Sequence, residues 1–150
     1  MEGIIQGAVI GALFGGFRQI TSLYISKKRE ERKQDAGFEN KHIRHLQGLE
    51  DNYLVLYEKA ANKSPRVYDL VSHSSEQIDK VVEIWLGYKT NKINSPSYHS
   101  VALKHFKLGM ISLRKSRNIL NEPISLAASN AIEKNVGEIL EMIHTLAIVT

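Results

Sequence analysis

The sequence predicts an all-α protein in which a single transmembrane (or long apolar) N-terminal helix precedes an up-down antiparallel four-helix bundle. Three observations predict this fold. An apolar N-terminal stretch is followed by a basic run, three prolines stand at nearly equal intervals, and apolar residues recur every three or four positions between the prolines. The predicted units are a transmembrane anchor over residues 1–26, a basic juxtamembrane linker over 27–37 and the bundle over 38–150.

The anchor is predicted from the apolar segment between Gly3 and Phe17. As a helix this segment rises about 22 Å, whereas an extension through Arg18 to Ile25 rises roughly 33 Å and matches a hydrocarbon layer of about 30 Å. Arg18 lies late in the segment, so its long side chain can reach the lipid-water interface. The extended segment is therefore expected to span a membrane once.

The charges around the segment predict its orientation. The chain begins Met1-Glu2, whereas a cleavable signal peptide carries positive charge in front of its apolar region, so we expect an uncleaved anchor. The basic residues lie late in the segment and behind it, and the positive-inside rule places them in the cytoplasm. The bundle would then be cytoplasmic, and the short N-terminus would lie outside the cell (inner) membrane. The membrane-orienting residues are Arg18, Lys27, Lys28, Arg29, Arg32 and Lys33.

Four glycines repeat at four-residue spacing within the apolar segment, and two alanines form a row beside them. Interior glycines weaken a helix unless close packing compensates, and small residues let membrane helices approach one another. The predicted oligomerisation residues are Gly3, Gly7, Gly11, Gly15, Ala8 and Ala12. This glycine ladder resembles the glycine zipper of some oligomeric channels and pore-forming proteins, which implies a homo-oligomer and, in its more specific form, a pore. Packing against another membrane protein, or within a soluble core, are the alternatives.

The three prolines predict where the bundle helices begin. Pro65 and Pro96 follow Ser64 and Ser95, and Pro123 follows Asn121-Glu122. Proline is tolerated in the first helical turn, and a preceding serine can cap exposed backbone N–H groups. The predicted helices cover residues 38–62, 65–90, 96–121 and 123–148, and their short connections favour antiparallel neighbours. No segment shows the sustained alternation of a β-strand.

The net charge of +4 is unevenly distributed. Residues 1–34 hold six basic and three acidic residues, so most of the excess lies beside the anchor, which argues against a nucleic-acid-binding surface. No acid occurs between Glu83 and Glu122, whereas that interval holds seven basic residues, so the third bundle helix is basic. Either it complements its acidic neighbours, or it docks an anion such as a lipid headgroup, nucleotide or nucleic-acid phosphate through one helical face formed by Lys104, Lys107 and Arg114.

One basic residue of this helix falls on its apolar stripe. A helical wheel places Arg117 near Met110 and Leu113, and a charge in that position needs a partner. Glu50 lies at the edge of the apolar stripe of the first bundle helix. We therefore predict an internal ion pair between Arg117 and Glu50.

The sequence offers little catalytic chemistry. Zero cysteines exclude disulfides, thiolate nucleophiles and cysteine-ligated zinc, and the common hydrolase and phosphate-loop motifs do not occur. His42 and His45 lie among Lys41 and Arg44 and are assigned to a solvated face. No metal ion, cofactor or catalytic residue is predicted.

Arg66 and His73, which are separated by six residues, resemble the Arg-x(4–6)-His element of HEPN ribonucleases, which are also helical bundles. The resemblance implies ribonuclease activity carried by these two residues. The sequence departs from the family pattern at Val67, where the family has a polar residue.

Taken together, these patterns predict a non-enzymatic membrane protein that self-associates and carries a sensor, docking or scaffold bundle, with a role as a pore, effector or toxin as more specific forms. Its expected partners are the membrane, further copies of itself, anionic lipid or another membrane protein. The alternative is a soluble or peripheral helical-bundle enzyme, such as a HEPN-like nuclease, or an anion- or nucleotide-binding module, whose N-terminal helix packs inside an oligomer.

Overall fold

The computed structural model describes residues 36–149, with side chains from residue 44 onward. This part of the chain is all-helical and contains no strand. Its four helices are α3 (Ala36–Ala61), α4 (Pro65–Lys89), α5 (Tyr98–Leu120) and α6 (Pro123–Ile148). Each bound lies within two residues of the sequence prediction, so the four-helix bundle is confirmed.

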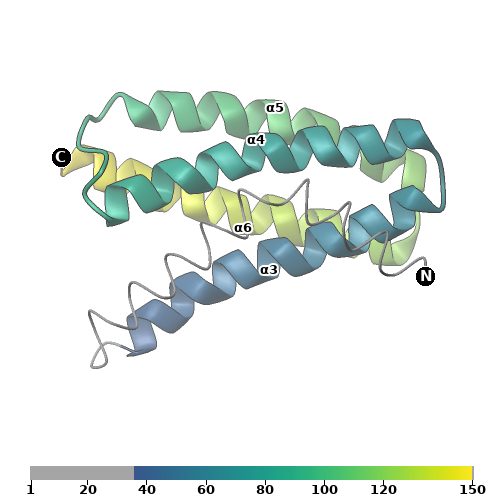
Figure 1. Cartoon of the computed structure of the whole chain (residues 1–150), viewed down its shortest axis with the longest axis horizontal. Coiled ribbons are helices and arrows are strands. Elements are labelled where there is room, and N and C mark those ends of the chain that lie inside the picture. The colour runs from purple at the N-terminus through teal and green to yellow at the C-terminus, as the bar shows by residue number, and fades with distance from the viewer. Residues whose placement is uncertain (1–35, 150) are drawn as a thin grey trace.

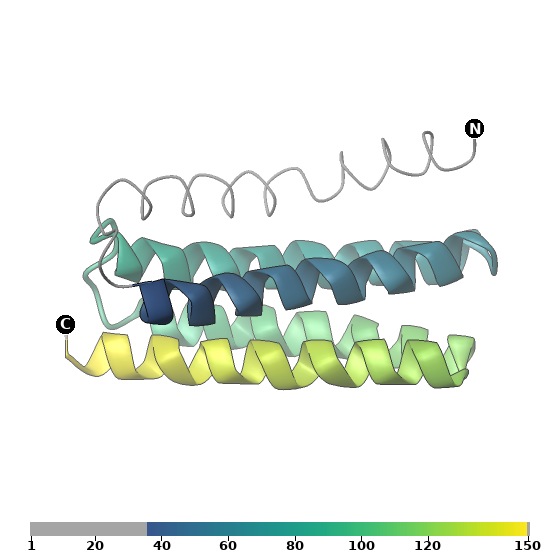
Figure 2. The ribbon, with the colours of Figure 1, turned by 90° about the horizontal axis from the view of Figure 1, so that it is seen from below.

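Consecutive helices run in opposite directions and lie side by side along their lengths (Figures 1 and 2). The most extensive packing joins α4 to α5 and α3 to α6, and α4 also contacts α6 across the centre of the bundle. Among residues 36–149, none of the helices combines the length and the apolar character that crossing a bilayer requires.

The helix starts follow local chemistry, with one exception. The hydroxyl of Ser64 accepts a hydrogen bond from the backbone N–H of Val67 at 3.4 Å, as its predicted capping role requires. The predicted helix start at Pro96 is two residues early, because α5 begins at Tyr98, and the Ser95 hydroxyl accepts a hydrogen bond from the backbone N–H of Ser97 at 3.4 Å in the turn before the helix. Pro96 therefore belongs to the connection between α4 and α5.

The core is continuous along the bundle and confirms most of the predicted apolar stripes. Ile124 continues the apolar spacing of the fourth predicted helix in the sequence, but it is 57% exposed. The largest fully buried side chains come from all four helices and are Trp85, Tyr53, Tyr57, Leu46, Leu49, Leu56, Ile78, Leu113, Ile132, Ile139 and Ile143.

Buried serines connect the helices with hydrogen bonds. The phenol of Tyr53 lies 2.9 Å from the Ser74 hydroxyl, and the phenol of Tyr57 lies 2.6 Å from the Ser75 hydroxyl, so α3 is joined twice to α4. Because a buried polar group is costly without a partner, these pairs favour one rotation of α3 against α4. Burial raises the pKa of both phenols, which keeps them protonated hydrogen-bonding groups.

A glycine brings α4 and α5 close together. A Cβ added at Gly109 would lie 2.8 Å from Cδ1 of Ile78, which is too close for a real side chain. On the same side of α5, the Ser112 hydroxyl lies 2.7 Å from Nδ1 of His73, and Nδ1 of His105 lies 2.7 Å from Oε1 of Gln77. This interface fixes which side of α5 faces α4 and therefore which side faces outward.

Candidate functional site

The predicted anchor and glycine ladder lie outside the described residues. The predicted residues that therefore lie outside the described part are the small residues Gly3, Gly7, Gly11, Gly15, Ala8 and Ala12, and the membrane-orienting basic residues Arg18, Lys27, Lys28, Arg29, Arg32 and Lys33. The candidate sites that the structure does describe lie on α5 and between α3 and α6.

Two arginines of α5 converge on one carboxylate of α6. Nε and Nη2 of Arg114 each donate to an oxygen of Glu133 at 3.1 Å, which forms a bidentate pair. Nη1 of Arg117 lies 4.0 Å from Glu133 and donates to Oδ1 of Asn130 at 2.6 Å. The hydrogen bond from Arg114 lowers the pKa of Glu133, so this carboxyl stays ionised. Charge complementarity between α5 and α6 therefore accounts for part of the basic character of α5.

This arrangement corrects the predicted partner of Arg117. The prediction that Arg117 needs a partner is sound, but its carboxylate comes from the adjacent α6 and not from Glu50, which lies on α3. In a bundle of this connectivity α3 and α5 occupy opposite corners, whereas α5 and α6 share a long interface. A helical wheel reports the direction of a residue but not the helix that it faces.

The three residues of the predicted anion-binding face, Lys104, Lys107 and Arg114, differ in the structure. Arg114 is already paired with Glu133, whereas Lys104 and Lys107 are exposed. Both lysines, and Lys115 on the same helix, form no ion pair with another residue of the described part. The surface available for an anion is therefore carried by these lysines, and Arg114 serves the bundle itself.

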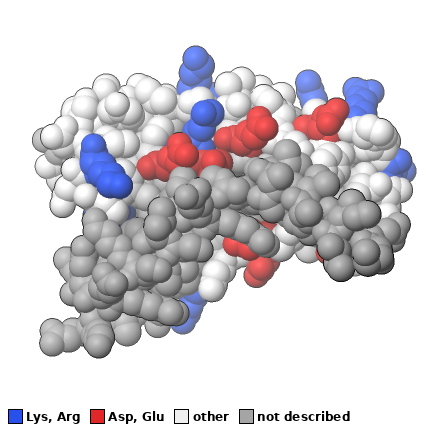
Figure 3. All heavy atoms as spheres, in the orientation of Figure 1, with Lys and Arg blue, Asp and Glu red and all other residues white. Residues whose placement is uncertain are grey.

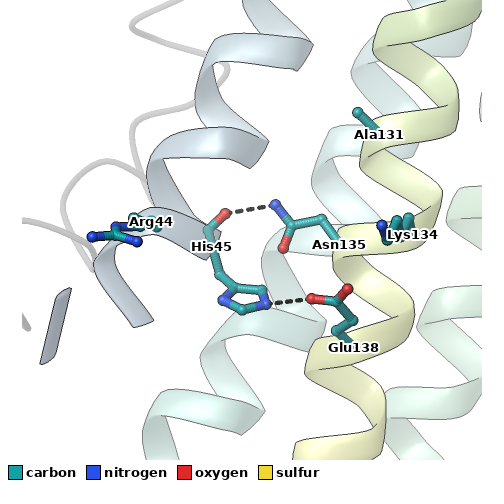
Figure 4. Close-up of a pocket in the computed structure, with 6 residues that line it drawn as sticks. All are labelled: Arg44, His45, Ala131, Lys134, Asn135 and Glu138. Atoms are coloured by element: carbon teal, nitrogen blue, oxygen red, sulfur yellow. Dashed lines mark hydrogen bonds and ion pairs between the residues drawn. The ribbon is translucent and has the colours of Figure 1, made fainter. Parts of the chain in front are cut away.

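An open pocket of about 300 Å³, to which five polar or charged residues and Ala131 contribute, lies between α3 and α6 (Figure 4). Nε2 of His45 lies 2.7 Å from Oε2 of Glu138, and Nδ2 of Asn135 donates to the backbone oxygen of His45 at 2.9 Å. Figure 4 also shows the Arg44 side chain directed away from the pair. Sequence reasoning missed this site, because its two halves are separated by 93 residues and no local pattern links them.

The pocket lining combines a histidine–carboxylate pair with the cationic side chains of Arg44 and Lys134. Glu138 orients the imidazole of His45, whose ring also packs edge-on against Trp85 at a centroid distance of 6.4 Å. Oδ1 of Asn135 is buried and has no hydrogen-bond partner within the part of the chain that the structure describes. The pocket can offer a polar ligand an oriented imidazole and the cationic side chains of Arg44 and Lys134. Over the same residues, no group of three side chains is arranged to hold a metal ion.

The two residues that resemble the HEPN element lie on α4. Arg66 and His73 are both exposed, and His73 forms the hydrogen bond to Ser112 that joins α4 to α5. That contact places His73 in the interface between α4 and α5. A pair of histidines joins α5 to α6, where the ring centroids of His99 and His144 lie 4.6 Å apart. Burial, and then His144, lower the pKa of His99.

Asp79 on α4 is a partly buried carboxyl whose Oδ1 has no hydrogen-bond partner among the described residues. Burial, together with the nearby charge of Glu83, raises its pKa from 3.8 to about 6. The native state therefore binds the proton more tightly than the unfolded chain does. The free energy of unfolding is expected to fall as the pH rises from about 4 to about 6, because the folded protein must then hold an ionised carboxylate in this place.

Replacing Asp79 with asparagine is expected to raise the free energy of unfolding at pH 7 by roughly 1 kcal/mol, a value discounted for the partial exposure of the group. Chemical denaturation of both proteins between pH 4 and pH 7 checks this result. The gain should shrink toward pH 4, where Asp79 itself is protonated. Asp69→Asn, an exposed position on the same helix, is the matched control and should change stability by less than about 0.5 kcal/mol at pH 7. Equal stabilisation by both substitutions would contradict the prediction.

No protein-family model matches this chain, and the searches of curated proteins and of solved structures likewise give no match. The functional proposal therefore rests on the sequence pattern and on the geometry of the described residues.

Proposed function

We propose that the chain is a non-enzymatic single-pass membrane protein that self-associates through its glycine ladder and carries the four-helix bundle as a cytoplasmic docking or scaffold module. One observation carries this proposal: Gly3, Gly7, Gly11 and Gly15 stand four residues apart in an apolar segment that is followed by a basic run, a spacing that would place them on one face of a helix. Such a face permits close helix contact in lipid, where small residues and dispersion forces drive association. A pore lined by the assembled helices is its more specific form.

The properties of the bundle support the second half of the proposal. Its described helices bury one continuous core, and the bidentate Arg114–Glu133 pair joins α5 to α6 on the surface. A bundle packed in this way positions its surface residues relative to one another, as a docking module requires.

A second candidate rests on the α3–α6 pocket. The His45–Glu138 pair, with Arg44 and Lys134 also lining the pocket, favours a module that binds a small polar ligand, in an assembly built by the N-terminal helix. Measuring whether the chain partitions into membranes distinguishes the two candidate functions, because the second candidate predicts a chain that is soluble or only peripherally attached.

The full-length chain is expected to sediment with membranes, to remain there after washing with 1 M salt and with alkaline carbonate, and to be released by detergent. Salt at this concentration shortens the Debye length to about 3 Å and removes proteins that are held by charge alone. A variant with both Val9→Arg and Leu13→Arg should move to the supernatant, because each arginine near the centre of the segment costs roughly 2.5–3.5 kcal/mol on insertion.

Recovery of the unaltered chain in the low-salt supernatant would overturn the membrane proposal and favour the second candidate. Release by salt without carbonate would point to peripheral attachment and would also contradict a spanning anchor.

A further inference from the structure

The outward side of α5 carries an unusual combination of side chains. Val101, Leu108 and Ile111 are 40%, 38% and 51% exposed, although they are aliphatic. Lys104 and Lys115 lie between them, and at 100° per residue all five fall within an arc of roughly 80° on the side opposite the buried residues of the helix. We call these five residues the α5 outer face.

The α5 outer face is positive without compensation. No acid occurs from residue 84 to residue 121, and its lysines and the neighbouring Lys107 form no ion pair with the described residues. Figure 3 shows Lys and Arg projecting along the edge where α5 lies in Figure 1, with Asp and Glu gathered below them over α4. The partner of this face must therefore bring negative charge as well as an apolar environment.

The outward side of α4 gives the contrast. Its exposed residues include Asp69, Glu76, Lys80 and Glu83, which carry both signs of charge and no large aliphatic group. Charges of both signs at helical spacing compensate one another and are typical of a face that is simply solvated. The α5 outer face lacks this compensation, and so a solvated face does not explain it.

We infer that the α5 outer face docks on the anionic surface of a lipid bilayer. In such a contact aliphatic side chains enter the boundary between headgroups and acyl chains, while lysines on the same side of the helix meet lipid phosphates. The inference extends the proposed function by a second contact between chain and membrane, and it holds whether or not the N-terminal segment spans the bilayer.

Two other occupants fit less well. A second copy of α5 would set lysine against lysine with no acid on either face, which is unfavourable when the charges are desolvated. A nucleic acid would neutralise the lysines through its phosphates, but it would leave Val101, Leu108 and Ile111 in water. Of these three occupants, the bilayer surface is the one that supplies both negative charge and an apolar environment.

The absence of native cysteine allows a site-specific test with the full-length chain. An environment-sensitive dye is placed on Ile111→Cys and, separately, on Asp51→Cys, an exposed position of α3. The labelled proteins are mixed with vesicles of phosphatidylcholine alone or with 30% phosphatidylglycerol. We expect the dye at position 111 to shift to the blue and to be protected from a water-soluble quencher only on the anionic vesicles, while the dye at position 51 stays accessible on both.

Charge variants sharpen the test. Each lysine near an anionic surface contributes roughly a fivefold factor to binding, so Lys104→Glu with Lys107→Glu should weaken docking by at least about 25-fold and expose the dye at position 111 again. The matched control is Lys63→Glu with Arg66→Glu, which makes the same charge change near the start of α4 and should leave the protection intact. Circular dichroism checks that both variants remain folded.

The outcomes separate this inference from the proposed function. Sedimentation of the chain with vesicles after a carbonate wash reports on the N-terminal segment. Protection of the dye at position 111 reports on α5 alone. The docking inference is overturned if the dye at position 111 stays accessible on anionic vesicles, if both vesicle types protect it equally, or if it is already protected in a vesicle-free oligomer, since that last result would identify a second copy as the occupant.

Discussion

Replacing Gly7 and Gly11 with leucine is expected to abolish the oligomer while leaving the chain in the membrane fraction. Leucine partitions into a bilayer better than glycine, so insertion is kept or strengthened. The two bulky side chains would stand in the middle of the glycine ladder and hold neighbouring helices apart, which removes the close contacts that drive association in lipid. Chemical crosslinking in membranes, followed by size-exclusion chromatography in mild detergent, measures the change.

Gly16→Leu provides a matched control for this experiment. Gly16 is also a glycine of the apolar segment, but on the predicted helix it lies roughly 160° from the centre of the ladder. The same substitution there should preserve the oligomer. If the Gly7 and Gly11 double variant still assembles like the unaltered chain, assembly belongs to the bundle. For the pore form of the proposal, purified protein should also conduct ions across a bilayer, and the double variant should not.

Replacing Leu113 with alanine is expected to lower the free energy of unfolding of the bundle by about 2–5 kcal/mol. Leu113 is fully buried in the core, so the truncation removes apolar contacts and leaves a cavity that the surrounding helices fill only in part. A loss of this size is a large share of the total stability of an ordinary domain. Trp85, the single tryptophan of the chain, is fully buried and reports the transition through its fluorescence during chemical denaturation.

Leu108→Ala is the control on the same helix. Leu108 is 38% exposed and belongs to the α5 outer face, so its truncation should cost less than about 1 kcal/mol. Equal losses from the two substitutions would mean that the core and the outer face of α5 are wrongly assigned. The same result would weaken the docking inference, because Leu108 would then serve folding.

The sequence predicted the bundle well because the signals involved are local. Pro65 and Pro123 begin α4 and α6 at the expected residues, since proline restricts the chain immediately around it. The three- and four-residue spacing of apolar residues located the buried stripe of each helix for the same reason. The third bundle helix begins two residues later than predicted, because Pro96 and Ser97 form a turn in front of Tyr98.

The candidate sites were predicted less completely. Lys104 and Lys107 were identified from charge, but the aliphatic residues beside them were not, because an apolar side chain in a bundle helix is ordinarily assigned to the core. The exposure of Val101 and Ile111 depends on how α5 is rotated against α4, which the close contact at Gly109 sets. The His45–Glu138 pair was missed because α3 and α6 meet only after the chain has folded back on itself.

By itself, therefore, the sequence determined the helical content, the helix boundaries within two residues, and the basic character of α5. Each of these depends on interactions between residues that are neighbours along the chain. Only the tertiary structure decided that Arg117 turns to Glu133 and not to Glu50, that His45 meets Glu138, and which side of α5 faces outward. These depend on the rotation and pairing of whole helices, which are set jointly by packing at contacts such as Gly109–Ile78 and by buried pairs such as Tyr53–Ser74.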